Sequence, residues 1–391
     1  MNELTPRTSL LLHSSSDLYG ASKILLTTVR KLKEKNEKLQ VVLSEEGPLA
    51  DAVREEGIVV HIIRLGILRR KYFNVPGLFN RFTILKQAFR ELVALAIREN
   101  VTHIYSNTSA VLIGAFVAKE LNVYHTWHIH EIITHPKWFA SLIGKIVNRY
   151  SDLVLVVSEA VKEHWDQYIS SYKLEVIHNG IDYAPYLSAE GNFNKNLPIQ
   201  PDTLLIGMIG RINAWKGQPY FLDIASKISD NYPQVHFVIV GDVFPGDEHL
   251  EAEMYQKISS LKLTEKVSVF GFRNDIADIL AALDIFILPS IQPDPLPTVV
   301  LEAMASAKPV VATAHGGACE MVADGITGIL IPWDDAEKSA KKVVPLLTDK
   351  PLRLEYGLQG RKRVLEHFSL EAFGDRMAKI FEQAYRRNEG K

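Results

Sequence analysis

Residues 289–314 read PSIQPDPLPTVVLEAMASAKPVVATA, and this stretch decides the fold. A proline-rich turn leads into a short helical pattern at 298–307, which Pro309 stops. The apolar run Val310–Ala312 that follows is typical of a buried strand. A short helix joined directly to a buried strand predicts an α/β protein with a parallel sheet.

Two acids in this stretch are placed to hold a nucleotide sugar. Asp294 precedes the helix, and Glu302 lies one turn inside it. The first acid can accept hydrogen bonds from sugar hydroxyls, and the free N–H groups of the helix start can hold a diphosphate. The second acid can bind both ribose hydroxyls. The alternative is an ordinary turn and helix of an α/β protein without a ligand.

Composition limits the classes of protein that the chain can belong to. Its 391 residues suit two or three domains, and a hydrophobic fraction of 47% is that of a globular protein. The net charge of −2 gives no general attraction to nucleic acid, which we do not expect as a partner. Cys319 is the only cysteine, so no intrachain disulfide can form, which fits a reducing compartment.

The ends of the chain and its apolar runs predict where the protein resides. The start, MNELTPRTSLLLHSSS, does not have the pattern of a signal peptide. No apolar stretch reaches the ~18 residues that a membrane span needs. We therefore expect a cytoplasmic protein, either soluble or peripheral on the inner face of the membrane.

Apolar runs bounded by turns alternate with helical patterns along the whole chain, as in parallel sheets flanked by helices. The alternation pauses in an Asn-, Pro- and Ser-rich stretch, which we interpret as a linker at 185–203. The sequence therefore predicts two α/β domains, 1–184 and 204–369, and a last helix at 370–391. The expected strands are Ser9–His13, Val41–Leu43, Val59–Ile63, His103–Tyr105, Tyr124–Ile129, Leu153–Val157, Glu175–Ile177, Leu204–Ile209, His236–Val240, Val267–Phe270, Ile285–Leu288 and Val310–Ala312.

Cationic side chains follow the first strand of the second half. In IGMIGRINAWKGQ, residues 206–218, an apolar strand ends at Gly210, and Arg211 and Lys216 come next. Ligands of open α/β sheets bind beyond the carboxyl ends of the strands. Arg offers a planar fork and Lys a point charge, so this pair can bind a diphosphate. Two solvated loop charges are the alternative.

Two segments of the first half also carry candidate residues. In SSSDLYGASK (14–23), Gly20 allows close approach of the backbone to a ligand at a helix start. In YHTWHIHEI (124–132), His128 and His130 share one face of a strand. A His–x–His pair can bind zinc, but no further ligand cluster is evident. Packed structural histidines are the other alternative.

Together these motifs resemble the retaining glycosyltransferases of family 4, which have the GT-B fold. Further stretches resemble the family in order and spacing: VIHNGID (176–182), FVIVGD (237–242), FGFRNDIADILAALDIFILPS (270–290) and HGGACEMVADGITGILIP (315–332). The resemblance is dense from about 150 to 335. It implies two Rossmann-like domains facing each other across a cleft, with the last helix crossing back to the N-terminal domain.

The resemblance also implies roles for individual residues. Arg211 and Lys216 would contact the donor phosphates, and Asp294 would orient the sugar. His130, with His128 as competitor, would lie close to the reacting sugar. The remaining expected donor-binding residues are Glu302 at the ribose, Arg273 in the stretch that meets the base, Gly20, Pro297 and Thr298.

The sequence departs from the family pattern at the first acid. The family usually has Glu where Asp294 stands, and the usual Gly–Phe–Gly is replaced by Pro295–Leu296–Pro297. Proline removes backbone donors, so the N–H and hydroxyl of Thr298 would supply the phosphate contact. The departure bears on the identity of the sugar more than on the class of reaction.

The stretch Arg64–Arg90 is basic and aromatic, with no acid in it. Such a surface suits anionic lipid headgroups, and family members with lipid-linked acceptors often have one. Lys137–Trp138–Phe139, Lys145 and Arg149 extend it. A solvated helix is the alternative. The basic residues are Arg64, Arg69, Arg70, Lys71, Arg81, Lys86 and Arg90, with Tyr72, Phe73, Phe79 and Phe82 between them.

These observations predict a retaining, metal-independent glycosyltransferase. It would move a sugar from a nucleoside-diphosphate sugar to a hydroxyl of a lipid-linked saccharide or other polysaccharide precursor, with no cofactor. A sugar-nucleotide 2-epimerase of the same fold and a non-catalytic partner subunit remain as alternatives. A nicotinamide oxidoreductase is weaker, because no G-x-G-x-x-G follows the first strand of either half.

Overall fold

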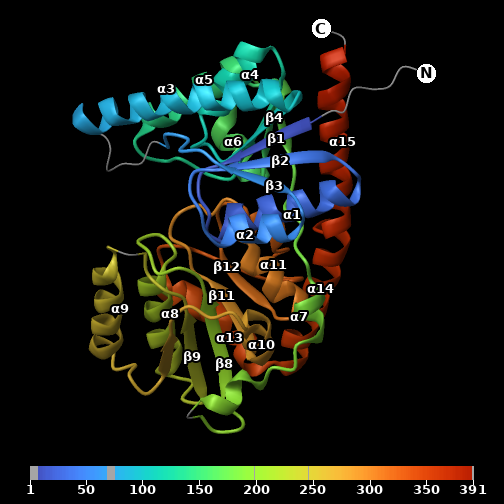
Figure 1. Ribbon diagram of the computed structural model, residues 1–391. Coiled ribbons are helices and arrows are strands. Elements are labelled where there is room, and N and C mark those ends of the chain that lie inside the picture. Colours follow the sequence, from blue (N-terminus) through green and yellow to red (C-terminus); the bar gives the residue numbers. More distant parts are fainter. Residues whose placement is uncertain (1–7, 68–74, 198, 245, 390–391) are drawn as a thin grey trace. The chain divides into compact units, whose positions relative to one another are not determined.

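The computed structural model describes residues 8–67, 75–197, 199–244 and 246–389. The chain divides into two compact units (Figure 1). The first unit comprises Met1–Gly180 with Leu370–Lys391, and the second comprises Ile181–Ser369. Arg69, Arg70, Lys71, Tyr72 and Phe73 of the basic stretch lie outside the described residues.

A parallel sheet of seven strands forms the centre of the first unit in the described part of the chain. Most of its strands are buried on both faces, and buried polar side chains such as Ser9, His103 and His125 lie among their apolar residues. From one edge to the other the strands are β3 (Val59–Ile62), β2 (Lys38–Leu43), β1 (Thr8–His13), β4 (Val101–Asn107), β5 (Tyr124–Ile129), β6 (Leu153–Val156) and β7 (Leu174–Val176).

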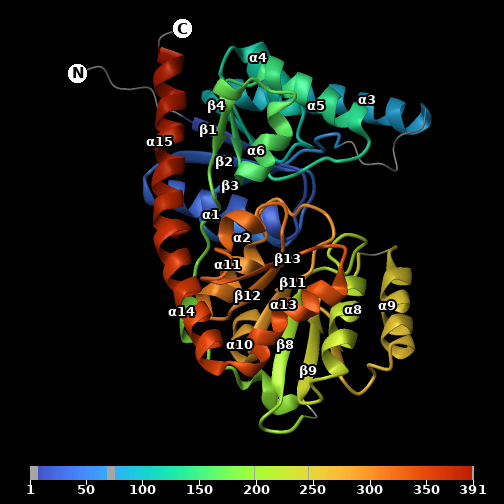
Figure 2. The same ribbon diagram turned by 180° about the vertical axis from the view of Figure 1, so that it is seen from behind.

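Helices cover both faces of this sheet. Helix α3 turns Leu92, Leu95 and Ala96 into a core with β1, β2 and β4, because apolar residues recur at helical spacing. Helix α4 contacts both α3 and α5, so these three form one layer (Figure 2). The helices of the unit are α1 (Gly20–Glu34), α2 (Pro48–Glu55), α3 (Val75–Arg98), α4 (Ile113–Leu121), α5 (Lys137–Tyr150), α6 (Glu159–Asp166) and α15 (Leu370–Glu389).

The C-terminal helix α15 belongs to the first unit, although more than 180 residues of the second unit precede it in the chain. It packs on α1, β4 and β5 (Figure 1). Phe381 of α15 is fully buried, and the hydroxyl of Tyr385 lies 2.7 Å from Ser9 Oγ of β1. The expected association of residues 370–391 with the N-terminal half is therefore present in the contacts.

The second unit is built on a parallel sheet of six strands in its described residues. From edge to edge these are β10 (Val267–Phe270), β9 (Val235–Val240), β8 (Leu204–Ile209), β11 (Ile285–Leu288), β12 (Val310–Thr313) and β13 (Gly328–Ile331). Its helices are α7 (Ala184–Ser188), α8 (Gln218–Ser229), α9 (Glu248–Ser260), α10 (Ile276–Ala282), α11 (Thr298–Ala305), α12 (Ala318–Met321), α13 (Ala336–Thr348) and α14 (Lys350–His367).

The stretch expected as a linker, 185–203, packs inside the second unit. Helix α7 contacts α10 and α11, and a 3₁₀ turn at Asn192–Asn196 contacts α10. Phe193 and Leu197 are buried there. These two apolar side chains anchor a segment whose polar, proline-containing composition resembles a linker, so the boundary between the units falls at Gly180 rather than at 184.

The two sheets agree with the α/β class and with the expected strands, most of which differ from the observed bounds by one or two residues at an end. None of the helices described here is long and apolar enough to cross a membrane.

Candidate functional site

An ion pair joins two of the expected donor-binding residues in the second unit. The Lys216 ammonium donates to Asp294 Oδ2, and only 18% and 7% of the two side chains are exposed. Lys216 lies on the loop after β8, and Asp294 on the loop after β11. Because β8 and β11 are neighbours in the sheet, their carboxyl ends bring the two loops together.

The loop that carries Lys216 is shaped by its own residues. Asn213 Oδ1 accepts hydrogen bonds from the N–H groups of Trp215 and Lys216, at 3.1 and 2.8 Å. Gly217 then adopts φ +83°, and a Cβ there would lie 1.9 Å from Pro289 O. Only glycine fits this position, so the turn delivers Lys216 to the strand ends at a defined place.

The loop that carries Asp294 is held by the glycine-rich turn after β12. Gly317 N–H donates to Asp294 O at 2.8 Å. Gly316 has φ +64°, and a Cβ there would lie 2.4 Å from the same carbonyl oxygen. The backbone of the turn therefore lies directly against Asp294, which explains two adjacent glycines at this point of the sequence.

Arg211 follows β8 and is half-buried. Its guanidinium carbon lies 3.2 Å from the centroid of the Phe244 ring, and Gln218 Nε2 donates to its carbonyl oxygen at 2.9 Å. A cation over an aromatic face is attracted by the ring quadrupole. Phe244 therefore supports the guanidinium, a contact between the loops after β8 and β9 that the sequence did not indicate.

Glu302 lies on the first turns of α11, which starts at Thr298 after Pro297. The hydroxyl of Tyr186 in α7 donates a hydrogen bond to the Glu302 carboxylate. Burial, together with the negative charge of Glu302, raises the pKa of Tyr186 well above its usual range, so Tyr186 stays a donor. Sequence reasoning missed Tyr186 because it stood in the presumed linker.

Arg273 and Gly20 are placed less specifically than the other expected residues. Arg273 lies at the surface, where its Nε donates to Asp275 Oδ1 at 2.8 Å. A Cβ at Gly20 would meet no protein atom within 4 Å, so the packing of the protein does not require glycine there. Gly20 is the first residue of α1, and space beside it is open, as a ligand contact would need.

His130 of the first unit takes part in a polar cluster at the carboxyl ends of β1, β4 and β5. Its Nε2 lies 2.8 Å from Asn107 Oδ1, and Asn107 Nδ2 lies 3.0 Å from His13 Nδ1. Glu131 Oε2 accepts the backbone N–H groups of His130 and Ser109. Burial lowers the pKa of His130 well below its ordinary value, which favours the neutral imidazole.

His128, the competitor of His130, is fully buried, and its Nδ1 bonds the Tyr105 hydroxyl. The two imidazole rings lie 4.1 Å apart. Among the described residues, no group of three or more His, Cys, Asp or Glu side chains is arranged to hold a metal ion. His130 is the more exposed of the two histidines and the better placed to meet a ligand.

His13 and Asn107 belong to this cluster but did not stand out in the sequence. Each is the last residue of a buried strand, and the register pairs His13 with Asn107 across β1 and β4. A polar residue closing a buried strand is a signal that could have indicated both positions, since ligand sites of parallel sheets lie at these ends.

Two family models match the chain, one in each half. Residues 19–184 match the model for Glycosyltransferase Family 4, and residues 190–363 match the model for Glycosyl transferases group 1. An Escherichia coli protein named UDP-Gal:alpha-D-GlcNAc-diphosphoundecaprenol alpha-1,3-galactosyltransferase is 25% identical over 388 residues, covering 93% of this chain and 94% of its own. The Rhizobium meliloti lipopolysaccharide core biosynthesis mannosyltransferase LpsB is 27% identical over 258 residues, 64% of this chain and 70% of its own.

Solved structures show the same fold. The crystal structure of HepE from Anabaena in complex with UDP and glucose has a TM-score of 0.83 at 24% sequence identity, covering 96% of this chain and 99% of that chain. A glycosyltransferase structure from Rickettsia africae has a TM-score of 0.81 at 21% identity. Two Rossmann-like parallel-sheet units and the matches along nearly the whole chain confirm the family expected from the motifs: this protein is a GT-B glycosyltransferase and belongs to glycosyltransferase family 4.

Proposed function

We propose that the protein transfers a sugar, with retention of configuration, from a nucleoside-diphosphate sugar to a saccharide hydroxyl. The observation that carries this proposal is the buried pair of Lys216 and Asp294 at the carboxyl ends of β8 and β11. A cation and a hydrogen-bond acceptor in contact fit two neighbouring groups of one ligand, a phosphate and a sugar hydroxyl.

Each residue of the second unit then has a chemical task. Lys216 and Arg211 offset the charge that develops on the departing diphosphate, a task that needs no metal ion when fixed cations perform it. The N–H of Thr298 at the start of α11 binds a phosphate oxygen, and Pro297 sets the direction of the helix start. Asp294 accepts from the sugar, and Glu302, oriented by Tyr186, accepts from the ribose hydroxyls.

Two features support a lipid-linked saccharide as acceptor. The name of the E. coli relative gives a diphosphoundecaprenol-linked acceptor and a UDP-sugar donor. In addition, the helical layer of the first unit exposes aromatic and basic side chains on α3 and α5. On α5 these follow helical spacing: Trp138, Leu142, Lys145 and Arg149 are exposed, whereas Ile143 and Val147 are buried. Such a face suits the cytoplasmic surface of a membrane.

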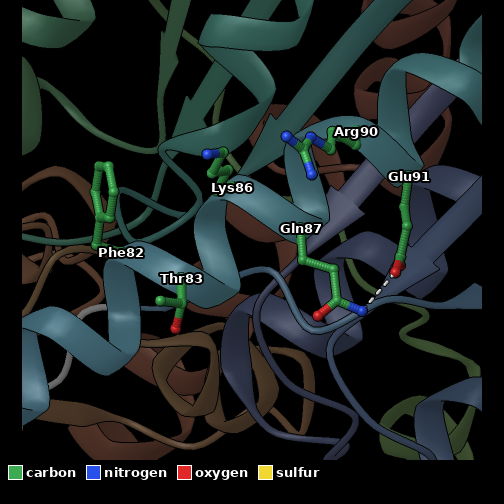
Figure 3. A pocket seen from close by; sticks show the side chains of 6 residues that line it. All are labelled: Phe82, Thr83, Lys86, Gln87, Arg90 and Glu91. Atoms are coloured by element: carbon green, nitrogen blue, oxygen red, sulfur yellow. Dashed lines mark hydrogen bonds between the residues drawn. The ribbon is translucent and has the colours of Figure 1, made fainter.

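The described part of α3 contributes to the same layer (Figure 3). Phe82 is 65% exposed, and it lines a surface pocket of about 630 Å³ with five other residues of the helix. Lys86 and Arg90 follow Phe82 at intervals of four residues and so share its side of the helix. None of the residues expected to bind the donor lines the pocket, whose lining residues are Phe82, Thr83, Lys86, Gln87, Arg90 and Glu91.

The proposed function is tested by donor binding followed by product analysis. In titration calorimetry with UDP-glucose, UDP-galactose and GDP-mannose, we expect one donor to bind in the presence of EDTA. With an undecaprenyl-diphosphate saccharide as acceptor, that donor should yield an elongated α-linked product, again in EDTA. Interconversion of the donor without acceptor would instead indicate an epimerase, and binding without any product a non-catalytic subunit. Activity lost in EDTA and restored by Mg²⁺ would contradict the metal-independent mechanism.

Binding to anionic vesicles tests the membrane part of the proposal. We expect the protein to sediment with vesicles rich in phosphatidylglycerol, weakly with neutral ones, and to be released by high salt. Each basic residue near an anionic surface contributes about 1 kcal/mol. Lys145→Glu with Arg149→Glu should therefore weaken binding at least about 30-fold, and Trp138→Ala should weaken it without changing the charge.

A matched control separates the α5 surface from net charge alone. Lys338→Glu with Lys362→Glu changes the net charge equally, but these exposed lysines lie on α13 and α14 of the second unit. This variant should keep most of its vesicle binding. If both double variants bind equally, or if the wild-type protein ignores anionic vesicles at low salt, the surface is a solvated face and a soluble acceptor is favoured.

A further inference from the structure

The polar cluster of the first unit forms one continuous chain of hydrogen bonds. It runs from His130 through Asn107 and His13 to Ser22 of α1 and ends at Asp17. His130 Nε2 lies 2.8 Å from Asn107 Oδ1, and Asn107 Nδ2 lies 3.0 Å from His13 Nδ1. His13 Nε2 lies 2.9 Å from Ser22 Oγ, which lies 2.9 Å from Asp17 Oδ1. Three of these side chains, Asn107, His13 and Ser22, are almost completely buried.

The direction of this chain is decided by a backbone carbonyl beside Asn107. Asn107 Nδ2 donates to Ala21 O at 3.1 Å. A carbonyl only accepts, so the NH₂ group of the amide must face Ala21, and its oxygen must face His130. An amide oxygen also only accepts. The proton on the neutral His130 ring must therefore be on Nε2.

The hydrogen bonds from His13 to Asp17 require the same donor-to-acceptor direction. The amide nitrogen of Asn107 cannot accept, so His13 Nδ1 is the acceptor and His13 Nε2 carries the proton. That proton points to Ser22 Oγ, whose own hydroxyl proton points to the Asp17 carboxylate. An ionised carboxylate only accepts, so every proton in the chain points away from His130 and toward Asp17. Aligned bonds of this kind polarise one another.

We propose that Asn107 is a positioning residue that holds His130 as the neutral Nε2–H tautomer and leaves Nδ1 as a hydrogen-bond acceptor. The other ring nitrogen can then bind a group that donates a proton, such as a saccharide hydroxyl. It cannot bind a phosphate oxygen, which only accepts. The identity of the ligand as a saccharide rests on the proposed function, whereas the tautomer rests on the hydrogen bonds alone.

The groups around His130 favour the neutral ring. Burial and the neighbouring His128 and His13 lower the pKa of His130, and Nε2 bonds an amide oxygen, not a carboxylate. Glu131 accepts from the backbone N–H of His130 and not from the ring, and its own pKa is raised by burial. Among the described residues, the charges of His13 on β1 and His128 on β5 act on His130, and Glu131 after β5 accepts its backbone N–H. Tyr105 on β4 bonds His128, and Asp17 is linked to His130 only through the hydrogen bonds described above.

Nitrogen NMR of the full-length protein labelled with ¹⁵N-histidine tests the tautomer directly. The His130 signals are assigned by their loss in His130→Asn. We expect a protonated Nε2 and an unprotonated Nδ1, unchanged across the neutral pH range. A protonated Nδ1 in the wild-type protein would overturn the proposal, and this measurement needs no variant of Asn107.

Asn107→Asp then tests the positioning role. The substitution keeps the size of the side chain but places a carboxylate beside Nε2, which should raise the pKa of His130 by roughly one to three units. We expect the NMR titration of His130 to move to higher pH in this variant. The acid limb of kcat/KM, measured with the donor identified by calorimetry, should move upward by the same amount. A purely structural asparagine would leave the pH profile of kcat/KM unchanged, although the new carboxylate would still shift the NMR titration.

Ser106→Ala is the matched control. Ser106 is the neighbouring residue of β4, is also buried, and bonds His125 Nε2 at 3.0 Å, so the variant removes one buried histidine hydrogen bond outside the chain. It should lower stability and leave the His130 tautomer and the pH profile unchanged. If Asn107→Asp shifts the NMR titration but not kcat/KM, the positioning role is overturned. If no donor is turned over at all, the proposed function fails and the NMR result on the tautomer still stands.

Discussion

Replacing Lys216 or Arg211 by alanine should lower turnover about 10²–10³-fold, the scale observed on removal of one group that stabilises a transition state. The reason is that both cations lie at the strand ends where charge would develop on the departing diphosphate. Lys216 is held there by Asp294, and Arg211 by the ring of Phe244. Preformed cations need not reorganise during the reaction, so their loss is felt in kcat.

The two variants should differ in stability. Lys216→Ala leaves the buried carboxylate of Asp294 without its partner, which costs about 3 kcal/mol or more when a buried ion pair is broken. Arg211 is half-buried on a loop, and its removal should cost less. The measurements are single-turnover rates with the preferred donor and thermal unfolding of the same preparations.

A double variant separates catalysis from folding. In Lys216→Met with Asp294→Asn, no unpaired buried charge remains, so stability should recover relative to Lys216→Ala while turnover stays low. Near-normal turnover in both Arg211→Ala and Lys216→Ala would remove the assignment of these residues to the phosphates. Recovery of turnover together with stability would show that Lys216 only maintains the fold.

Acidification should strongly destabilise the first unit, because four of its histidines are almost completely buried as neutral rings, in addition to His130. Burial lowers the pKa of His13 to about 4 and of His103, His125 and His128 to about 3. In the unfolded chain each returns to about 6.5. Below that value the unfolded state binds more protons than the folded state, so stability falls as the pH falls. The stability that the neutral histidines contribute is fully present above their unfolded pKa of about 6.5, and it is lost progressively as the pH falls below that value.

The expected size of this effect is large. One pH unit corresponds to about 1.36 kcal/mol for each proton taken up on unfolding. Because the unfolded imidazole is already half protonated at pH 6.5, each of the four histidines removes about 1.6 kcal/mol between about pH 6.5 and 5, and together they remove about 6 kcal/mol. That is comparable with the total stability of a typical domain, about 5–15 kcal/mol. Burial raises the pKa of Glu131, so protonation of this carboxyl stabilises the folded state as the pH falls. This offsets part of the loss, but it is a single group acting against several histidines.

Urea denaturation at a series of pH values, followed by the fluorescence of the buried Trp127 and Trp165 of the first unit, measures this dependence. The slope of the unfolding free energy with pH should correspond to the uptake of about four protons in the range below about pH 6. His125→Asn should reduce the slope by about one proton. An unfolding free energy that stays constant from pH 7 to about pH 5 would contradict buried neutral histidines.

Most of the fold could be predicted from the sequence, because it depends on local patterns. Buried parallel strands are often continuous apolar runs, so Leu204–Ile209 was recognised with its observed bounds. Tyr124–Ile129 was also recognised with its observed bounds, although polar residues interrupt its apolar ones. The helix at Thr298 was indicated by the proline before it and by its apolar spacing. The neighbourhood of Lys216 and Asp294 also followed from the sequence, since both come directly after strands whose ends meet at one edge of a parallel sheet.

The environment of these residues was decided only by the tertiary structure. His13 and Asn107 are 94 residues apart, yet they are partners in the register of β1 and β4. Tyr186 meets Glu302, and Phe244 meets Arg211, because helices and loops from distant parts of the chain pack on the same sheet. No periodicity or spacing encodes such contacts. They arise because folding removes these polar and charged groups from water, and each must then find its hydrogen bond or its counter-charge among whichever side chains the sheet topology brings beside it.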